Sequence, residues 1–442
     1  MGSTKPYLFL CLLTLHSLFY LCFSHSDNSL VLVISFDGFR WDYLEKAKTA
    51  GKSTPSFDYL ISSGVSIKGP GGVKNVFATF TFPNHYSLAT GLYAENHGVV
   101  HNEMFDPDTN ETFRNTPTQN EDSKWWDNGT PGEGPEPIWI ANQHDSPQAL
   151  FKKRSGVYFW PGSLAVNHGT RPFHYKSYDE TVTNKTRINT MLEWFSTEDN
   201  PINLGFLYFD QPDAMGHLVG PDHPALIDNI VALDDLVGYL LNEMERKHLH
   251  KRLNLVITSD HGMTAITNYI SVDEFVDPIS YNHYGESPVW HIVPEPGMEE
   301  QVYESFKKVP NATLYKKEEI PEHFHYKHNK RIMPLILVAD KGQMLCHNVS
   351  TCYLMNGDHG YTNEDLDMQP MFVAHGPAFK RDFKVDQFEI VDIYPLLCHL
   401  LDIEPSPHDG DLERVEIMLE VHDNSLITTT TSTIVFSLDH IN

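Results

Sequence analysis

The chain has 442 residues, 40% of them hydrophobic and 12% aromatic, a composition that excludes an intrinsically disordered protein and permits a large core. Its formal charge of −27, from 59 acidic and 32 basic residues, excludes a protein that binds a nucleic-acid backbone, because that contact needs a basic face. A small phosphorylated substrate is compatible with this charge, since metal ions at a site reverse the local sign.

The N-terminus predicts a signal peptide over residues 1–26. Lys5 supplies its positive charge, an apolar run follows over residues 6–23, and small residues come next. The run approaches the length of an uncleaved anchor, but polar residues 27–28 favour cleavage. We therefore expect an extracellular protein, secreted or at the cell surface.

Asparagine sequons and cysteines fit that compartment. Five Asn-x-Ser/Thr sequons are expected to carry glycans on surface loops: Asn110, Asn128, Asn184, Asn311 and Asn348. Cys346 and Cys352 are expected to close a small disulfide loop, and Cys398 to be a buried thiol in an apolar run.

The first apolar run, Ser29 to Phe36, predicts a buried strand that ends at Asp37-Gly38. A helical segment interrupted at Pro55 follows over residues 43–63. The hydroxyl of Thr81 then lies where an apolar segment gives way to Pro83 and a predicted helix over residues 84–91. Residues 102–137 are polar and rich in Pro and Gly, which indicates a long surface excursion.

Two more apolar runs predict strands with acidic ends. Residues 202–209 lead to Asp213, with His217 four positions later on the same helical face or side of a tight loop. Residues 254–259 lead to Asp260-His261. Helices are predicted over residues 180–196 and 227–246, between and after these strands.

The rest of the chain predicts a small inserted α+β unit, with a strand and a helix over residues 289–311. A short strand over 335–339, a glycine-flanked loop around His359, a strand over 371–374 and a closing helix over 391–401 follow.

The repeated pattern of strand and acidic end is the strongest signal in these residues. Because parallel strands end at one edge of a sheet, Asp37, Asp213, Asp260 and His261 are expected to lie together there. Carboxylates combined with imidazoles suit zinc, whereas calcium or magnesium would favour oxygen ligands alone.

Five motifs then carry a resemblance. They are Asp37-Gly38-Phe39-Arg40, Thr81-Phe82-Pro83-Asn84-His85-Tyr86, Pro212-Asp213 with Gly216-His217, Ser259-Asp260-His261-Gly262-Met263 and Asp358-His359-Gly360-Tyr361. In this order they resemble the nucleotide pyrophosphatase/phosphodiesterase family of the alkaline phosphatase superfamily. The likeness is to the short branch of the family, which carries the catalytic domain alone. It implies an α/β fold: a central, mostly parallel sheet flanked by helices on both faces, with a small inserted α+β subregion.

The resemblance also implies domain limits. It covers about residues 29–410, so we expect a phosphodiesterase catalytic domain over 27–410 and a polar, Thr-rich tail over 411–442. Short-branch relatives usually carry a C-terminal membrane span, and none is evident in this sequence.

The resemblance implies a catalytic role for Thr81 as the nucleophile, with Thr79 as the weaker alternative. It implies two zinc ions, one held by Asp213, His217 and His359. The other would be held by Asp37, Asp260, His261 and the Thr81 oxygen. Attack by Thr81 on phosphorus would form a phosphothreonine diester that water then hydrolyses.

Substrate-binding residues follow in the same way. Asn102 matches the residue that binds the phosphoryl oxygen, and Phe82 and Tyr178 match the aromatic pair that sandwiches a nucleobase. Trp160 falls near that pocket, although ordinary core packing explains it as well. We expect a monomer that acts on small nucleotides, and the acidic net charge indicates no nucleic-acid partner.

The predicted activity is hydrolysis of NAD, ADP, ATP or dinucleoside polyphosphates to nucleoside 5′-monophosphates. Two alternatives stay open. The same site could act on choline phosphoesters or lysophospholipids, or the chain could be a glycosylated adhesion or receptor ectodomain with a vestigial site.

Overall fold

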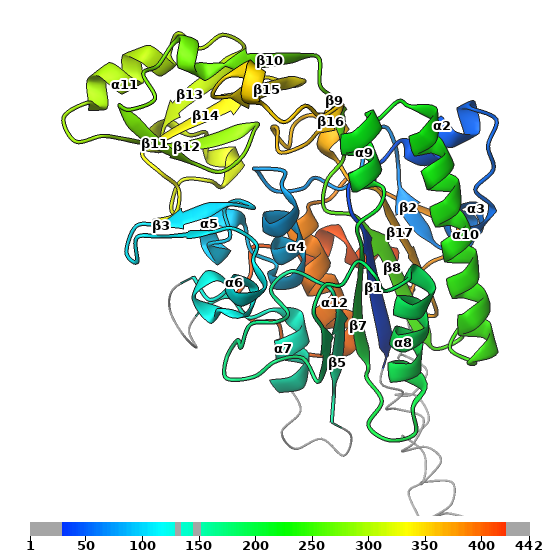
Figure 1. The fold of residues 1–442 in the computed structure, drawn as a ribbon. Coiled ribbons are helices and arrows are strands. Elements are labelled where there is room, and N and C mark those ends of the chain that lie inside the picture. The colour runs from blue at the N-terminus through cyan, green and yellow to red at the C-terminus, as the bar shows by residue number, and fades with distance from the viewer. Residues whose placement is uncertain (1–28, 129–133, 145–151, 421–442) are drawn as a thin grey trace, which may run out of the picture.

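The computed structural model describes residues 29–128, 134–144 and 152–420 (Figure 1). The predicted signal peptide and residues 421–442 lie outside the described residues. No helix in the described part is long and apolar enough to cross a membrane.

A central sheet of eight strands organises the molecule. Its order is β18 (Phe383–Val385), β2 (Val65–Ile67), β17 (Phe372–His375), β8 (Leu253–Thr258), β1 (Leu30–Phe36), β7 (Leu204–Phe209), β5 (Ser155–Tyr158) and β6 (His174–Lys176). The run from β8 to β6 is parallel, whereas β17 is antiparallel to both of its neighbours. The sheet is therefore mixed but mostly parallel, as predicted.

Strand β1 explains why its sequence is apolar throughout. Val31 and Val33 belong to the hydrophobic cluster on one face of the sheet, and Leu32 and Ile34 belong to the cluster on the other. A strand with helices on both faces needs apolar side chains at every position.

Helices cover both faces (Figure 1). On one side lie α2 (Tyr43–Thr49), α3 (Pro55–Ser63), α8 (Asn184–Ser196) and the long α10 (Pro224–Arg246). On the other lie α4 (Thr81–Thr90), α7 (Ile138–His144) and α12 (Ile393–Leu401). Two short helices, α5 (Ala94–His97) and α9 (Asp213–Val219), follow α4 and β7 respectively.

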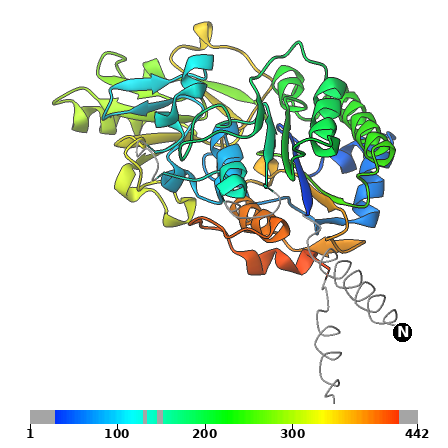
Figure 2. The same ribbon diagram turned by 90° about the horizontal axis from the view of Figure 1, so that it is seen from below.

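The predicted inserted unit is present and has its own core. Its antiparallel sheet runs in the order β11 (Tyr281–Tyr284), β12 (Val289–Pro294), β14 (Leu335–Ala339) and β13 (Ala312–Lys316), with α11 (Glu299–Phe306) packed on it. In both views the unit lies on the opposite side of the molecule from α10 (Figure 2). Two short ladders accompany it, β10 (Asn268–Ser271) with β15 (Gln343–Cys346) and β9 (Thr264–Ala265) with β16 (Gly357–Asp358).

The interpretation of residues 102–137 as a surface excursion is confirmed for the exposed residues 107–111 and 114–118 but is wrong for the buried residues 125–127 of that segment. It forms the hairpin β3 (Met104–Asp106) and β4 (Glu111–Phe113) and the short helix α6 (Pro117–Glu121). Trp125 and Trp126 are fully buried. Arg331, which is also fully buried, bonds the carbonyl oxygens of Gly98 and Trp125 from a distant part of the chain.

The C-terminal end of the described chain is packed. Val415 and Met418 are buried, and the Lys380 amide donates to the Met418 carbonyl, so the folded part continues beyond residue 410. The predicted disulfide joins Cys346 and Cys352, and Cys398 is buried in α12 outside that disulfide.

Candidate functional site

Three strand ends form one edge of the sheet, as the sequence predicts. Asp37 follows β1, Asp260 follows the adjacent β8, and Asp213 begins α9 shortly after β7. The Asp213 amide donates to the Asp37 carbonyl at 2.9 Å, and the Gly38 amide donates to Asp260 Oδ1 at 3.2 Å. Gly38 has a φ of +68°, and a Cβ there would lie 2.8 Å from the Asp213 Cβ, so this close approach requires glycine.

Thr81 is the first residue of α4, three positions earlier than the predicted start of the helix. Its Oγ1 lies 3.2 Å from His261 Nε2, across 180 residues of sequence. The alternative hydroxyl, Thr79, is fully buried; it donates to the Tyr361 carbonyl and accepts from the Gly360 amide. The structure therefore brings Thr81 and not Thr79 to the carboxylates.

Three histidines point Nε2 toward those carboxylates and Nδ1 toward backbone carbonyl oxygens. The Nδ1 atoms of His217, His261 and His359 lie within 3.0 Å of the carbonyl oxygens of Gly357, Gly262 and Thr79, respectively, to which they donate. Nε2 is therefore the unprotonated atom in each neutral ring. A backbone acceptor on one ring nitrogen is the usual way in which proteins orient an imidazole toward a metal ion.

The Nε2 atoms converge on shared carboxylate oxygens. His217 Nε2 lies 3.3 Å from Asp213 Oδ2, and His359 Nε2 lies 3.6 Å from Asp213 Oδ1. His261 Nε2 lies 3.3 Å from Asp37 Oδ1 and 3.0 Å from Asp260 Oδ2.

Ligand-type atoms lie within 4.8 Å of one another in three groups of the described residues: Asp213, His217 and His359; Asp37, Asp213 and His261; and Asp37, His85 and Asp260. The first group coincides with one predicted zinc set, and the other predicted set is divided between the remaining two.

Buried oxygens test whether these residues suit a cation. Asp37 Oδ1, Asp213 Oδ1 and Asp260 Oδ2 are buried with no hydrogen-bond partner in the described part of the chain. Buried carboxylate oxygens are almost always satisfied, so three orphans in one place fit a bound cation. The mixture of carboxylate and imidazole donors fits zinc.

The pKa shifts of these side chains agree with a site that binds cations. Burial, together with the nearby Asp260 and Asp213, raises the pKa of Asp37 well above its usual value. Burial would also raise the pKa of Asp213, but the adjacent His217 lowers it to about 2. Burial and the neighbouring His261 lower the pKa of His359 to about 3, which keeps its ring in the neutral form that binds metals.

Asn102 lies beside the hydroxyl. Its Oδ1 accepts the backbone N–H of Phe82 at 2.9 Å, which leaves its amide NH₂ as the donor end. Asn102 and Thr81 line one recess of about 270 Å³ together with Asp37 and Asp213. A phosphoryl oxygen at Thr81 could therefore accept a hydrogen bond from Asn102.

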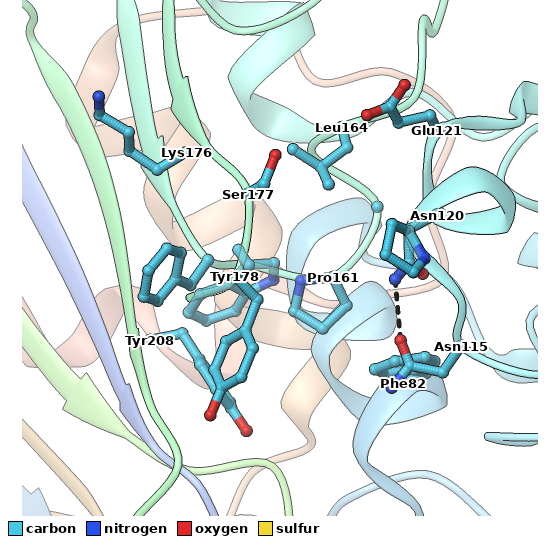
Figure 3. A pocket seen from close by; sticks show the side chains of 14 residues that line it. Phe82, Asn115, Asn120, Glu121, Pro161, Leu164, Lys176, Ser177, Tyr178 and Tyr208 are labelled. Atoms are coloured by element: carbon cyan, nitrogen blue, oxygen red, sulfur yellow. Dashed lines mark hydrogen bonds between the residues drawn. The ribbon is translucent and has the colours of Figure 1, made fainter. Parts of the chain in front are cut away.

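A larger cavity of about 430 Å³ adjoins this recess, and Phe82 and Tyr208 line both. Figure 3 shows Phe82 at one side of the cavity and Tyr178 and Tyr208 at the other. Tyr178 is 53% exposed, so its ring is accessible to a ligand in the cavity. Trp160 also lines the cavity but is buried, with its Nε1 donating to the His85 carbonyl, so it is mainly a packing residue.

Two residues of the site were missed by sequence reasoning. His85 Nδ1 lies 2.8 Å from the Thr81 carbonyl oxygen and 3.3 Å from Asp260 Oδ2. The Tyr208 hydroxyl donates to Asp37 Oδ2 at 2.5 Å. His85 lies one helical turn after Thr81, which is a usable signal, whereas Tyr208 lies within an ordinary apolar strand.

The predicted glycan positions differ in exposure. Asn110, Asn311 and Asn348 are exposed, and Asn184 is half-buried at the start of α8. Asn128 is half-buried, and its side chain bonds Asn329 and the Asn96 carbonyl, which makes it the least accessible of the five.

This fold and this edge of clustered carboxylates, imidazoles and one hydroxyl define a hydrolase of the alkaline-phosphatase type. The model of the family "Type I phosphodiesterase / nucleotide pyrophosphatase" matches residues 31–362, and the chain belongs to that family. It is a phosphodiesterase/nucleotide pyrophosphatase in enzyme class, the class that the names of its relatives also state.

Relatives show how far the likeness extends. The chain is 44% identical to human ectonucleotide pyrophosphatase/phosphodiesterase family member 5 over 92% of this chain and 82% of that protein. It is 39% identical to the Xenopus laevis bis(5′-adenosyl)-triphosphatase enpp4 over 90% of this chain and 83% of that protein.

Among solved structures, murine ectonucleotide pyrophosphatase/phosphodiesterase 5 matches with a TM-score of 0.82 and 43% identity. The match covers 89% of this chain and all of that chain, which is an inactive threonine-to-alanine variant in complex with AMP.

Proposed function

We propose that the protein is an extracellular, zinc-dependent nucleotide pyrophosphatase/phosphodiesterase that works through a phosphothreonine intermediate. Its substrates are nucleotides such as NAD, ADP, ATP and dinucleoside polyphosphates, and its product is a nucleoside 5′-monophosphate. The observation that carries the proposal is the Thr81 hydroxyl 3.2 Å from His261 Nε2, next to three buried and unpartnered carboxylate oxygens.

In this proposal Asp213, His217 and His359 hold one zinc ion, and Asp37, Asp260, His261 and the Thr81 oxygen hold the other. Zinc at these positions lowers the pKa of a hydroxyl and neutralises charge on phosphoryl oxygens. Two metals about 4 Å apart are typical of sites where oxygens attack and leave phosphorus in line.

The chain's own residues perform the other parts of the reaction. Thr81 Oγ1 attacks phosphorus in line and becomes esterified as the bond from phosphorus to the leaving oxygen breaks and the alcohol or phosphate part of the substrate departs. α4 begins at Thr81, whose hydroxyl lines the recess. Asn102 donates from its amide to a phosphoryl oxygen as negative charge develops there. Hydrolysis of the threonine diester then restores the hydroxyl.

Phe82 and Tyr178 would sandwich the nucleobase in the adjoining cavity. The AMP complex of the murine relative supports a nucleotide as ligand, and the inactivity of its threonine-to-alanine variant supports a threonine nucleophile.

The remaining assignments are proposals of the same kind. Residues 1–26 are a signal peptide, the catalytic domain runs from residue 27 past the predicted limit of 410 to about residue 419, and a polar tail follows. The exposed sequons at Asn110, Asn311 and Asn348 are the first places to look for glycans.

An assay of four substrates tests the function. Purified protein is given p-nitrophenyl-TMP, NAD, ATP and a p-nitrophenyl phosphocholine ester, with zinc and after complete zinc removal. We expect hydrolysis of the nucleotide substrates that disappears with the metal. A preference for the phosphocholine ester would favour the alternative activity on choline phosphoesters.

Thr81→Ala separates the mechanism from the substrate. The variant should lose turnover, and Thr81→Ser, which restores a hydroxyl, should recover part of it. Thr49→Ala, which removes an exposed hydroxyl in the last turn of α2, is the matched control. Turnover that survives Thr81→Ala would refute the nucleophile.

A further inference from the structure

Tyr208 lies between the large cavity and the smaller recess at Thr81, and it belongs to no sequence motif of the site. It is the penultimate residue of β7, and the sheet register pairs it with Ser35 of β1, two residues before Asp37. Its side chain lines both the large cavity and the smaller recess at Thr81. We propose that Tyr208 is a positioning residue that orients the Asp37 carboxylate toward the metal and couples it to the base cavity.

Tyr208 holds one side of the buried Asp37 carboxylate. Asp37 is 2% exposed, and its two oxygens have different surroundings. Oδ2 accepts the Tyr208 hydroxyl at 2.5 Å, whereas Oδ1 has no hydrogen-bond partner among the described residues and lies 3.3 Å from His261 Nε2. The phenol therefore determines which oxygen faces the ligand cluster.

This restraint matters because an aspartate carboxylate rotates easily. Its terminal torsion has a broad, roughly two-fold energy profile, so the backbone alone does not fix the carboxylate plane. A second hydrogen bond to a ligating carboxylate is a common means of fixing it, and losing such a partner typically weakens metal binding about 10- to 100-fold.

The Tyr208 ring lies beside Tyr178 and His85. The Tyr208 ring centroid lies 6.4 Å from that of Tyr178, which we propose contacts the base, and 5.3 Å from that of His85. His85 Nδ1 in turn lies 2.8 Å from the Thr81 carbonyl oxygen. One side chain thus contacts the wall of the base cavity, a ligand carboxylate and the histidine behind the nucleophile.

Tyr208→Phe removes only the hydroxyl and keeps the ring. The measurements are zinc affinity by competition with a chromophoric chelator, the visible spectrum of the cobalt-substituted protein, and kcat and KM for p-nitrophenyl-TMP. We expect zinc affinity to fall about 10- to 100-fold, with a changed cobalt spectrum. At saturating zinc kcat should fall while KM stays near its wild-type value, because the cavity wall is intact.

Two variants supply the contrast. Tyr158→Phe removes a hydroxyl from the neighbouring strand β5, where the ring packs on Phe159 and Trp194, and should leave all four quantities unchanged. Tyr178→Ala should raise KM for p-nitrophenyl-TMP and leave zinc affinity unchanged.

The inference rests on the proposed function, but different results would overturn the two. Wild-type zinc affinity, cobalt spectrum and kcat in Tyr208→Phe would overturn the inference even if the wild-type enzyme hydrolyses nucleotides. If the wild-type protein hydrolyses none of the four substrates, the proposed function fails, and the zinc affinities of wild type and Tyr208→Phe still decide whether Tyr208 orients Asp37.

Discussion

Asn102 offers a sharp test because its two ends have separate tasks. Its Oδ1 accepts the Phe82 amide at 2.9 Å, and its NH₂ is the proposed donor to the phosphoryl oxygen. Asn102→Asp keeps the shape and the acceptor but removes the donor. Asn102→Ala removes both and leaves the Phe82 amide without its acceptor.

The expected magnitudes follow from those contacts. Loss of one donor to a developing oxyanion costs about 10²- to 10³-fold in kcat, or about 2.7–4 kcal/mol. The aspartate adds a negative charge beside the transferring phosphoryl group, so Asn102→Asp should lose at least as much activity as Asn102→Ala. Only Asn102→Ala should lose stability, by about 1–3 kcal/mol, because it strands a backbone donor.

The assay is kcat for p-nitrophenyl-TMP at saturating zinc, together with urea unfolding of each variant. Asn189→Asp, which adds the same charge at an exposed position of α8, is the control and should behave as wild type. Either Asn102 variant retaining kcat within about five-fold of wild type would refute this role, because one oxyanion donor is worth about 10² or more.

Three further predictions concern stability. Burial lowers the pKa of His97 to about 3, so as the pH falls below about 6.5 the unfolded chain gains a proton that folded His97 does not. The free energy of unfolding should therefore fall by about 2 kcal/mol between pH 6.5 and 5 through this residue, and urea titrations of His97→Gln should lack that share of the slope; equal slopes would contradict it. Arg331→Met removes the buried guanidinium 3.0 Å from Asp106 and leaves that carboxylate only Lys330, 3.2 Å away, so it should cost about 3 kcal/mol in urea unfolding, with partial recovery when Asp106→Leu is added; a loss below about 1 kcal/mol would argue against the pair. Zinc at a thousand times its dissociation constant should stabilise the metal-stripped protein by about 4 kcal/mol in thermal unfolding, and His359→Gln should reduce that gain; an equal gain in this variant would exclude His359 as a ligand.

The sequence predicted the parts of the fold that depend on local hydrophobic pattern. For the strands that precede Asp37, Asp213 and Asp260, the predicted first and last residues differ from the observed ones by at most two positions. These strands are adjacent and parallel, so they place the three aspartates together as expected. The direction of β17 was not predictable, because an apolar run of four residues carries no information about the orientation of its partner.

Long-range contacts account for most of the features that could not be predicted from the sequence. Residues 102–137 are predicted to form a surface segment because their composition is polar, but Arg331, more than 200 positions away, donates hydrogen bonds to the carbonyl oxygens of Lys124 and Trp125. Tyr208 was missed because its contact with Asp37 is also long-range. The apolar pattern around Tyr208 is that of any buried strand, and only the pairing of β7 with β1 brings its hydroxyl to Asp37.

The central claim is that Thr81 attacks phosphorus and is itself esterified. The stereochemical course of hydrolysis tests this most directly, with a nucleotide whose α-phosphorus is made chiral by oxygen isotopes or sulfur. Two successive in-line displacements predict net retention of configuration at phosphorus. Net inversion would show a single direct attack by water and would contradict the account.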